Sequence, residues 1–437
     1  MAHHYICKMI KWILLCVAHT FIIDFSFAQT RREDIYTDFV LYQKRASLEK
    51  DLRERVIAKA FSMPLDSNTE YKYASACDAV TQFLFANSDV ENGFRKLFYY
   101  YDSLEYDTKR SFLEALYTAY PKRFRDDVHA VIQKENDARL FCICAAYLYR
   151  CDSSINNCNF LKIRMVEKFP GYDSLSILAE LEKYLSYHNS FVLQKTPDII
   201  ELFKYQRTNG NKTIYSFQRY NRDYPGIAIV QNANGSFVKN TDGSLMIIEQ
   251  LARSGSDLPY FVTNGSTPQG VYSVQGTYVS HNNFIGPTPT LQLILPFENK
   301  WEKYFQQDWD ASEDSLVLYK KLLPPNWRKY EPIMEAWYAG KIGRTAIIAH
   351  GTALDPKYFK GKPFYPLAPS QGCLCAKELW NETTGKLLMS EQFNLVSAFQ
   401  STPGNKGYLY VINLDNQQKA VSRQEAETLV KKFEAAR

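Results

Sequence analysis

The chain lacks a strong excess of charge of either sign. Its 52 Lys and Arg residues stand against 47 Asp and Glu residues, which leaves a formal net charge of +5 over 437 residues. Domains that bind nucleic acids usually carry a pronounced basic surface. DNA and RNA are therefore set aside as partners.

Long apolar runs are also missing beyond the first 28 residues, so the rest of the chain predicts no membrane span. In the first 28, Lys8 and Lys11 precede an apolar run that ends with small residues, Ser26 and Ala28, at the −3 and −1 positions of a cleavage site. We expect a signal peptide over residues 1–28 and export to the periplasm or cell envelope. An uncleaved anchor is the alternative, although Asp24 interrupts the run.

A usual metal-binding pattern is absent as well. Seven of the nine cysteines follow the predicted leader, and an odd number leaves at least one thiol free. Four of them, Cys142, Cys144, Cys151 and Cys158, could form a zinc site or disulfides, but their spacing fits no usual zinc pattern and no histidines accompany them. We expect no metal. A disulfide between Cys151 and Cys158 suits an exported protein.

In the first half of the chain after the predicted leader, apolar residues recur with the period of an α-helix. Phe94, Leu97, Phe98 and Tyr101 recur at helical spacing, and similar sets occur before and after them. Residues 31–190 are therefore predicted to form an all-α bundle or a short solenoid. We interpret this helical domain as a scaffold.

From about Thr213 the pattern becomes that of β-strands. Strands are predicted at 226–230, 236–238 and 245–248, joined by Asn-Gly and Asp-Gly turns at 234–235 and 242–243, and again at 271–278, 291–295 and 408–412. Residues 213–415 thus predict a mostly β domain. The more helical, aromatic insertion at 301–342 has two interpretations, a lid over a site or a peripheral pad. The whole chain is expected to be an α+β multidomain protein.

A C-terminal helix is predicted over residues 420–437. Ser422 and Glu425 have the spacing of a capping box, and Leu429, Val430 and Phe433 then fall on one face.

One stretch carries residues suited to nucleophilic chemistry. An apolar run at 345–349 predicts a buried strand that ends at His350, and Ser370-Gln371-Gly372-Cys373 follows. A cysteine that attacks an acyl group needs a base and backbone N–H groups for the oxyanion, and this stretch contains both kinds of group. The alternative is a core histidine and a buried thiol that never meet.

The order of these features resembles that of the L,D-transpeptidase (YkuD-type) catalytic domain. The resemblance covers about residues 220–415 and includes Thr267-Pro268-Gln269-Gly270-Val271-Tyr272, His350-Gly351-Thr352 and Ser370-Gln371-Gly372-Cys373. It implies remodelling of bacterial peptidoglycan, with stem peptides as substrates and no cofactor.

The resemblance also implies roles for individual residues. Cys373 would be the nucleophile, His350 the base, and the Gly351 carbonyl the group that orients the imidazole. Ser370, Gln371 and Gly372 would form the site loop, in which the N–H groups around Gly372 and Cys373 hold the oxyanion. Lys357, Tyr358 and Tyr365, from the segment between the two motifs, are candidates for substrate binding, and solvated side chains are the alternative for the lysine.

Two positions depart from the family pattern. Gln371 stands where a second histidine is usual, and Cys375 stands where an Arg or Asn usually follows. A catalytically silent wall-binding or interaction protein therefore remains an alternative function, as does a thiol hydrolase, either an L,D-carboxypeptidase or a peptidase.

Overall fold

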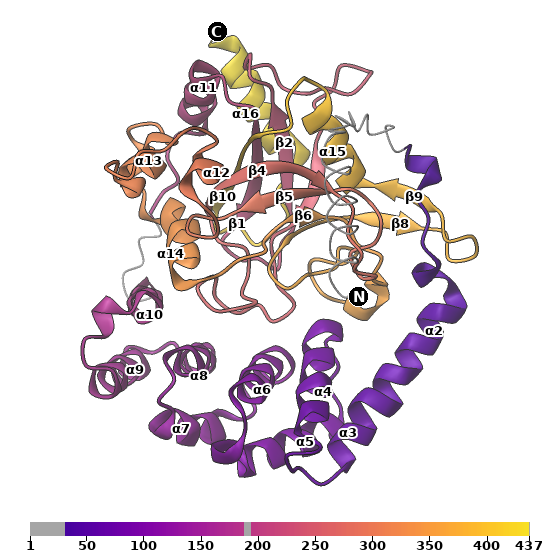
Figure 1. The fold of residues 1–437 in the computed structure, drawn as a ribbon, viewed down its shortest axis with the longest axis vertical. Coiled ribbons are helices and arrows are strands. Elements are labelled where there is room, and N and C mark those ends of the chain that lie inside the picture. The colour runs from indigo at the N-terminus through magenta and orange to yellow at the C-terminus, as the bar shows by residue number, and fades with distance from the viewer. Residues whose placement is uncertain (1–30, 188–193, 437) are drawn as a thin grey trace, which may run out of the picture.

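The protein is a mixed α+β chain in which helices fill the first half and a β-barrel forms the second (Figure 1). The computed structural model describes residues 31–187 and 194–436, so the predicted signal peptide lies outside the described residues. Within that part, no helix has the length and apolar character needed to cross a membrane.

The helical domain is a curved stack of two rows (Figure 1). The row nearer the barrel consists of α4 (Glu70–Phe83), α6 (Tyr106–Ala119), α8 (Ala138–Cys151) and α10 (Ser176–Tyr187), and the outer row includes α5 (Ser88–Tyr99), α7 (Arg125–Lys134) and α9 (Ile155–Lys168). At its start, α2 (Tyr42–Asp51), a π-helix (Leu52–Ala58) and α3 (Lys59–Ser62) form an arm. Of the two predicted arrangements, the observed one has the form of a short solenoid.

Local sequence explains these helices. Phe112, Leu113 and Leu116 give α6 a continuous buried face, and neighbouring helices pack the same type of side chain against it. Asp137 begins α8 because its carboxylate accepts hydrogen bonds from the backbone N–H groups of Arg139 and Leu140.

The described residues of the second half form a closed barrel with the strand order β1-β10-β4-β5-β6-β7-β3-β2. Its strands are β1 (Thr213–Arg219), β2 (Gly226–Gln231), β3 (Ile248–Leu251), β4 (Gly270–Tyr278), β5 (Thr290–Ile294), β6 (Ala349–His350), β7 (Leu374–Ala376) and β10 (Gly407–Asp415). A separate hairpin pairs β8 (Glu378–Trp380) with β9 (Leu387–Ser390).

Three predicted strands are shorter than the apolar pattern indicates or are reduced to bridges. The strand expected at 345–349 is reduced to β6, because Ala346 has a positive φ of 60° that interrupts an extended backbone. The segments at 236–238 and 245–247 form only isolated bridges, such as Gln231 with Phe237, although both predicted Gly turns are present with positive φ at Gly235 and Gly243.

The 301–342 segment contains α12 (Trp301–Phe305), α13 (Ser315–Lys321) and α14 (Glu335–Ile342). Its buried aromatic side chains, Tyr304, Tyr319 and Trp327, share a core with Tyr215 and Tyr410 of the barrel strands. The insertion therefore packs on the barrel as a pad. This core also includes α11 (Ile199–Asn209) and α16 (Arg423–Ala435), and Ser422 and Glu425 form the predicted capping box at the start of α16.

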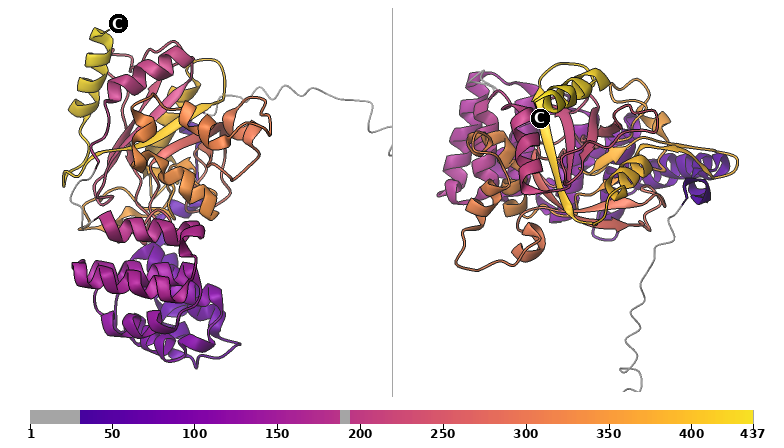
Figure 2. Two further views of the ribbon diagram at one scale, coloured as in Figure 1. Left: turned by 90° about the vertical axis from the view of Figure 1, so that its left-hand side faces the viewer. Right: turned by 90° about the horizontal axis from the view of Figure 1, so that it is seen from above.

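The helical domain lies at one end of the barrel, and the C-terminus lies at the other (Figure 2). One hydrophobic core runs across the junction, since Phe261 and Phe364 of the second half belong to the same buried cluster as the α4, α6 and α8 side chains. Polar contacts add to it, including Asn264 Nδ2 to Glu114 Oε2 at 3.1 Å and Arg139 Nη2 to the Ile342 carbonyl at 2.8 Å.

The cysteines of the helical domain have no metal-site geometry. Cys142 and Cys144 are fully buried in α8, and no group of three His, Cys, Asp or Glu residues within 31–187 and 194–436 is placed to hold a metal ion. The disulfide expected between Cys151 and Cys158 is not formed, because Cys151 is a free thiol whose Sγ lies 3.5 Å from the Pro121 carbonyl.

Candidate functional site

The His350 and Cys373 motifs meet at neighbouring parallel strands. In β6 and β7, Ala349 is in register with Leu374 and His350 with Cys375. Paired residues of parallel strands point to the same side of a sheet, so Cys375 shares the face of His350. Cys373 lies two residues before Cys375, in the bend that leads into β7. Ala349 and Leu374 point the other way, into the buried core.

The imidazole of His350 is buried and oriented by its own chain. Its Nδ1 lies 2.5 Å from the Gly351 carbonyl, which is the contact that the sequence predicts. A carbonyl accepts only from a protonated nitrogen, so Nδ1 carries the hydrogen in the neutral ring and Nε2 has the lone pair. Burial lowers the pKa of His350 below its ordinary value of 6.5. The neutral ring with a basic Nε2 is thus the form at neutral pH.

Cys373 is half-buried and contacts the strand that leads to His350. Its Sγ lies 3.5 Å from the Ile348 N–H and 3.5 Å from the Ala346 carbonyl. Burial raises the pKa of this thiol above 9.0, while the Ile348 N–H and the nearby Arg344 oppose that shift. Among the described residues, no hydrogen bond joins Cys373 to His350. The thiol is therefore protonated at rest, and a base must remove its proton.

The loop before Cys373 has a tightly constrained backbone. Gly372 has a φ of 105°, and a Cβ at this position would lie 2.5 Å from the Gly265 carbonyl and 2.6 Å from Arg344 Nη2. Only glycine fits here without displacement. Arg344 fixes the opposite side of the loop through the carbonyls of Gly265 and Ser266, at 2.9 and 3.0 Å.

Backbone N–H groups in this loop differ in availability. The Cys373 N–H, expected to face an oxyanion, instead donates to Ser370 Oγ at 2.8 Å, and that hydroxyl donates to the Cys373 carbonyl at 3.0 Å. Within the described residues, no acceptor takes the Gly372 N–H. The Gly372 N–H is consequently a backbone donor next to Cys373 in sequence that has no protein acceptor in this part of the structure.

The Thr-Pro-x-Gly motif lies against this loop. Thr267 Oγ1 donates to the Gly372 carbonyl at 2.9 Å, and the Tyr272 hydroxyl donates to the Pro268 carbonyl at 2.7 Å. The fold therefore brings together all three motifs that carry the resemblance, although about a hundred residues separate the first from the last.

A buried carboxyl group supports the turn after His350. A Cβ on Gly351 would collide with the Glu378 carboxyl group, and Ser390 Oγ donates to Glu378 Oε1 at 2.6 Å. Burial raises the pKa of Glu378 to about 7. Sequence reasoning missed this residue, because nothing in its spacing from His350 indicates the contact.

The remaining predicted residues do not join the pair. Lys357 is exposed and lies 3.2 Å from Glu382 Oε1, while Tyr358 packs its ring against Phe83 of α4, with centroids 4.9 Å apart. Tyr365 and Gln371 are exposed. Cys375 is buried and free, so it does not block Cys373 as a disulfide.

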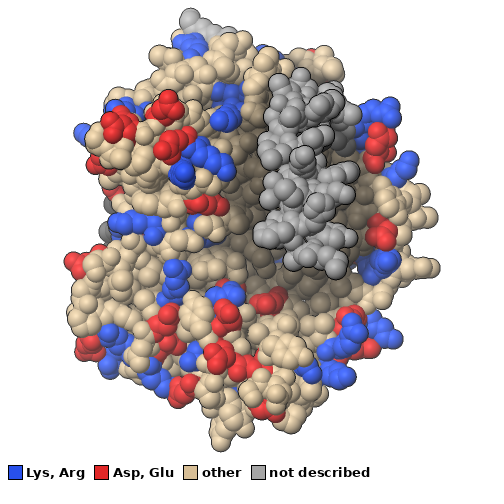
Figure 3. Space-filling view, viewed as in Figure 1, with Lys and Arg blue, Asp and Glu red and all other residues tan. Residues whose placement is uncertain are grey.

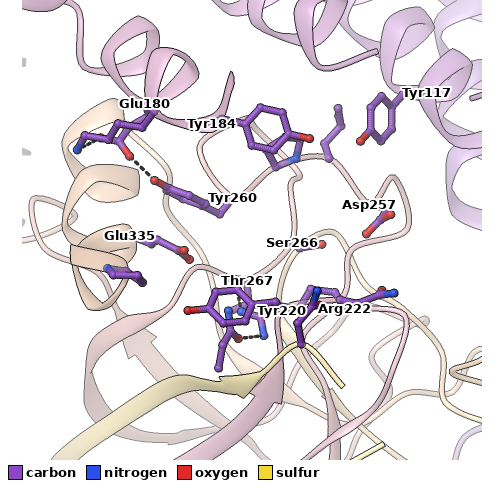
Figure 4. Close-up of a pocket in the computed structure, with 17 residues that line it drawn as sticks. Tyr117, Glu180, Tyr184, Tyr220, Arg222, Asp257, Tyr260, Ser266, Thr267 and Glu335 are labelled. Atoms are coloured by element: carbon purple, nitrogen blue, oxygen red, sulfur yellow. Dashed lines mark hydrogen bonds and ion pairs between the residues drawn. The ribbon is translucent and has the colours of Figure 1, made fainter. Parts of the chain in front are cut away.

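A second feature is a cavity of about 530 Å³ between the helical domain and the barrel (Figure 4). Sequence reasoning missed it, because its walls come from distant segments. Tyr117, Glu180 and Tyr184 line it from the helices, and Arg222, Asp257, Thr267 and Glu335 line it from the barrel side. Thr267 is the one residue of the three motifs that reaches this cavity.

Comparisons with family models, with curated proteins and with solved structures find no match for this chain. The functional argument therefore depends on the motifs and on the geometry around them.

Proposed function

We propose that this protein is an exported L,D-transpeptidase that remodels peptidoglycan through a cysteine thioester on stem peptides. The proposal depends on one observation above all. His350 is held by the Gly351 carbonyl with Nε2 as its basic atom, on the strand whose preceding residues contact Cys373 Sγ.

In the proposed reaction, His350 Nε2 takes the proton of Cys373 as the sulfur attacks a peptide carbonyl of the donor stem. The Gly372 N–H stabilises the oxyanion of the tetrahedral intermediate. The C–N bond then breaks, the terminal D-amino acid leaves with the proton held by His350, and a thioester remains. An amine of a second stem attacks the thioester, and the thiol is regenerated as an amide forms.

A carbapenem tests this proposal, because its strained amide can acylate a nucleophilic cysteine. The chain beginning at Gln29 is incubated with the compound and its intact mass is measured. We expect one adduct on the wild-type chain and on Cys375→Ala, and none on Cys373→Ala. A missing wild-type adduct, or an adduct that persists in Cys373→Ala, would contradict the proposed nucleophile.

A second candidate function, a catalytically silent wall-binding protein, is favoured by one observation. The Cys373 N–H is occupied by Ser370 Oγ, which leaves the oxyanion site with fewer donors than the resemblance implies. Binding of isolated peptidoglycan without any adduct, and without change in its muropeptides, would support this second function over the first.

A further inference from the structure

The cavity between the helical domain and the barrel has the size and lining of a ligand site. Its volume of about 530 Å³ lies within the 300–1,000 Å³ that is usual for small-molecule sites. Charged side chains of both signs and several tyrosines line it, so it differs from a gap in apolar packing (Figure 4).

Arg222 is the cation at the barrel wall of this cavity. The side chain is 8% exposed, and in the described part of the chain no carboxylate lies within ion-pair distance of it. Its guanidinium donates from Nη1 to the Arg219 carbonyl and to Asn413 Oδ1, and from Nη2 to the Thr267 carbonyl at 3.0 Å. These bonds leave the Nε–H and one Nη2–H. A buried cation without an anion favours a negatively charged ligand group.

Two carboxyl groups face the same cavity. Glu335 accepts from the Gln269 N–H at 2.8 Å, and the nearest cations to Asp257 are Arg150 and Arg253, each at 3.7 Å. Asp257 is thus within ion-pair distance of two cations, whereas no cation of the described residues forms an ion pair with Glu335. Burial raises the pKa of both acids, to about 7 for Glu335. A ligand ammonium would favour the ionised form of Glu335.

Other charged groups that face the cavity are already paired. Lys183 Nζ lies 2.8 Å from Glu180 Oε1, and the Tyr260 hydroxyl donates to Glu180 Oε2. Arg222 and Glu335 therefore remain as the charged groups that a ligand can satisfy. Together they present one positive and one acidic position around a single space.

We propose that this cavity binds the end of a peptide that carries both a carboxylate and an ammonium group. The carboxylate lies on Arg222, and the ammonium lies on Glu335. The inference does not require Cys373 to be a nucleophile. If the proposed transpeptidase reaction operates, Thr267 connects the cavity with the Cys373 loop. It lines this cavity and donates to the Gly372 carbonyl at 2.9 Å.

Calorimetric titration of the Cys373→Ala chain tests the site without any acylation. The probe is the tripeptide N-acetyl-Ala-Glu-Lys, compared with its C-terminal amide, its Nε-acetyl form and free lysine. We expect saturable binding of the parent peptide, and binding weakened at least about tenfold by either modification, since each removes a charge-assisted hydrogen bond.

Glu335→Gln keeps an oxygen that accepts from the Gln269 N–H and removes the charge, together with the 3.3 Å bond from Gln269 Nε2 to Oε1. In this variant the parent and Nε-acetyl peptides should bind equally, while the C-terminal amide should remain weaker. Glu135→Gln, which changes a buried acid in the helical domain that does not line the cavity, should leave all four affinities as they were.

Absence of binding by the parent peptide, or equal binding of the parent, amide and Nε-acetyl peptides, would overturn the inference. Free lysine that binds as tightly as the parent would assign the site to free amino acids and refute a peptide end. Carbapenem adducts are measured separately on the Cys373-containing chain, so failure of this site and failure of the proposed nucleophile are distinguishable.

Discussion

The His350–Cys373 pair and the cavity around Arg222 and Glu335 are two different kinds of candidate site. Backbone groups make most contacts in the first, such as Gly351 to the imidazole and Ile348 to the thiol. Side chains from both halves of the chain line the second. The comparison shows that short motifs can indicate a candidate reactive pair, whereas a cavity lined by distant segments is found only in the assembled fold.

Charge is distributed differently at the surface and in the cavity. On the face seen in Figure 3, acidic and basic side chains are interspersed over both halves of the molecule. In the cavity, Arg222 and Glu335 are held apart by separate hydrogen bonds to Thr267 and Gln269. Charges of both signs alternate on that surface, while Arg222 and Glu335 in the cavity form no ion pair with the described residues.

The largest effect should come from His350→Ala, which removes the proposed base from the His350–Cys373 pair. We expect the carbapenem acylation rate to fall by about 10²- to 10⁴-fold, the usual contribution of general-base catalysis. Stopped-flow acylation followed by mass measurement checks this. His281→Ala, which removes an exposed histidine, is the matched control and should react normally. Equal rates for both variants would exclude His350 as the base.

The pH dependence of acylation should reflect the assignment of His350 as the base. His350 is basic only when neutral, and burial lowers its pKa below 6.5, whereas burial raises the Cys373 pKa above 9.0. The rate should therefore rise with pH through a value below 6.5 and stay level to about pH 9, above which thiolate forms without the base. A rate that first rises near pH 9 would point to a thiol without base assistance.

Gly372→Ala should distort the backbone of the loop that precedes Cys373. The new Cβ meets the Gly265 carbonyl and Arg344 at a φ of 105°, so we expect about 2 kcal/mol less unfolding free energy and slower acylation. Gly404→Ala is the control, since Gly404 has a φ of 94° and no atom within 4 Å of its Cβ position. It should lose about 1 kcal/mol. Denaturant unfolding measures both, and equal losses would refute the proposed collision.

Thr267→Val tests the hydrogen bond that connects the cavity wall to the loop before Cys373. The variant keeps the shape but leaves the Gly372 carbonyl without its donor, and a hydrogen bond of about 1 kcal/mol corresponds to a roughly fivefold slower acylation. Thr267→Ser retains the hydroxyl and should react at nearly the wild-type rate. The same rate in Val and Ser variants would show that the contact does not position the loop.

The smallest effect should come from Lys357→Ala. Lys357 is exposed and ion-paired with Glu382, so its removal should change acylation and stem-peptide turnover by less than about twofold. Muropeptide analysis measures the turnover. A larger loss would support the predicted role of Lys357 in substrate binding.

Periodicity predicted most of the elements, because each depends on neighbouring residues. The strand at 271–278 is present within one residue, and the C-terminal helix predicted at 420–437 is present within three. The predicted strand at 345–349 is mostly absent, since the positive φ of Ala346 accompanies a bond from its N–H to Glu298 Oε1, a contact from far along the chain. Local pattern does not encode such a contact.

By itself, the sequence determined the helical and β-rich halves and the turns at Gly235 and Gly243, and it singled out the His350 and Cys373 motifs as candidates, since spacing and residue type carry that information. Only the tertiary structure decided that the strands close into a barrel, that Ser370 occupies the Cys373 N–H, and that Arg222 and Glu335 face one cavity. These features depend on long-range packing and burial, which bring distant residues together and determine which polar groups remain unpaired.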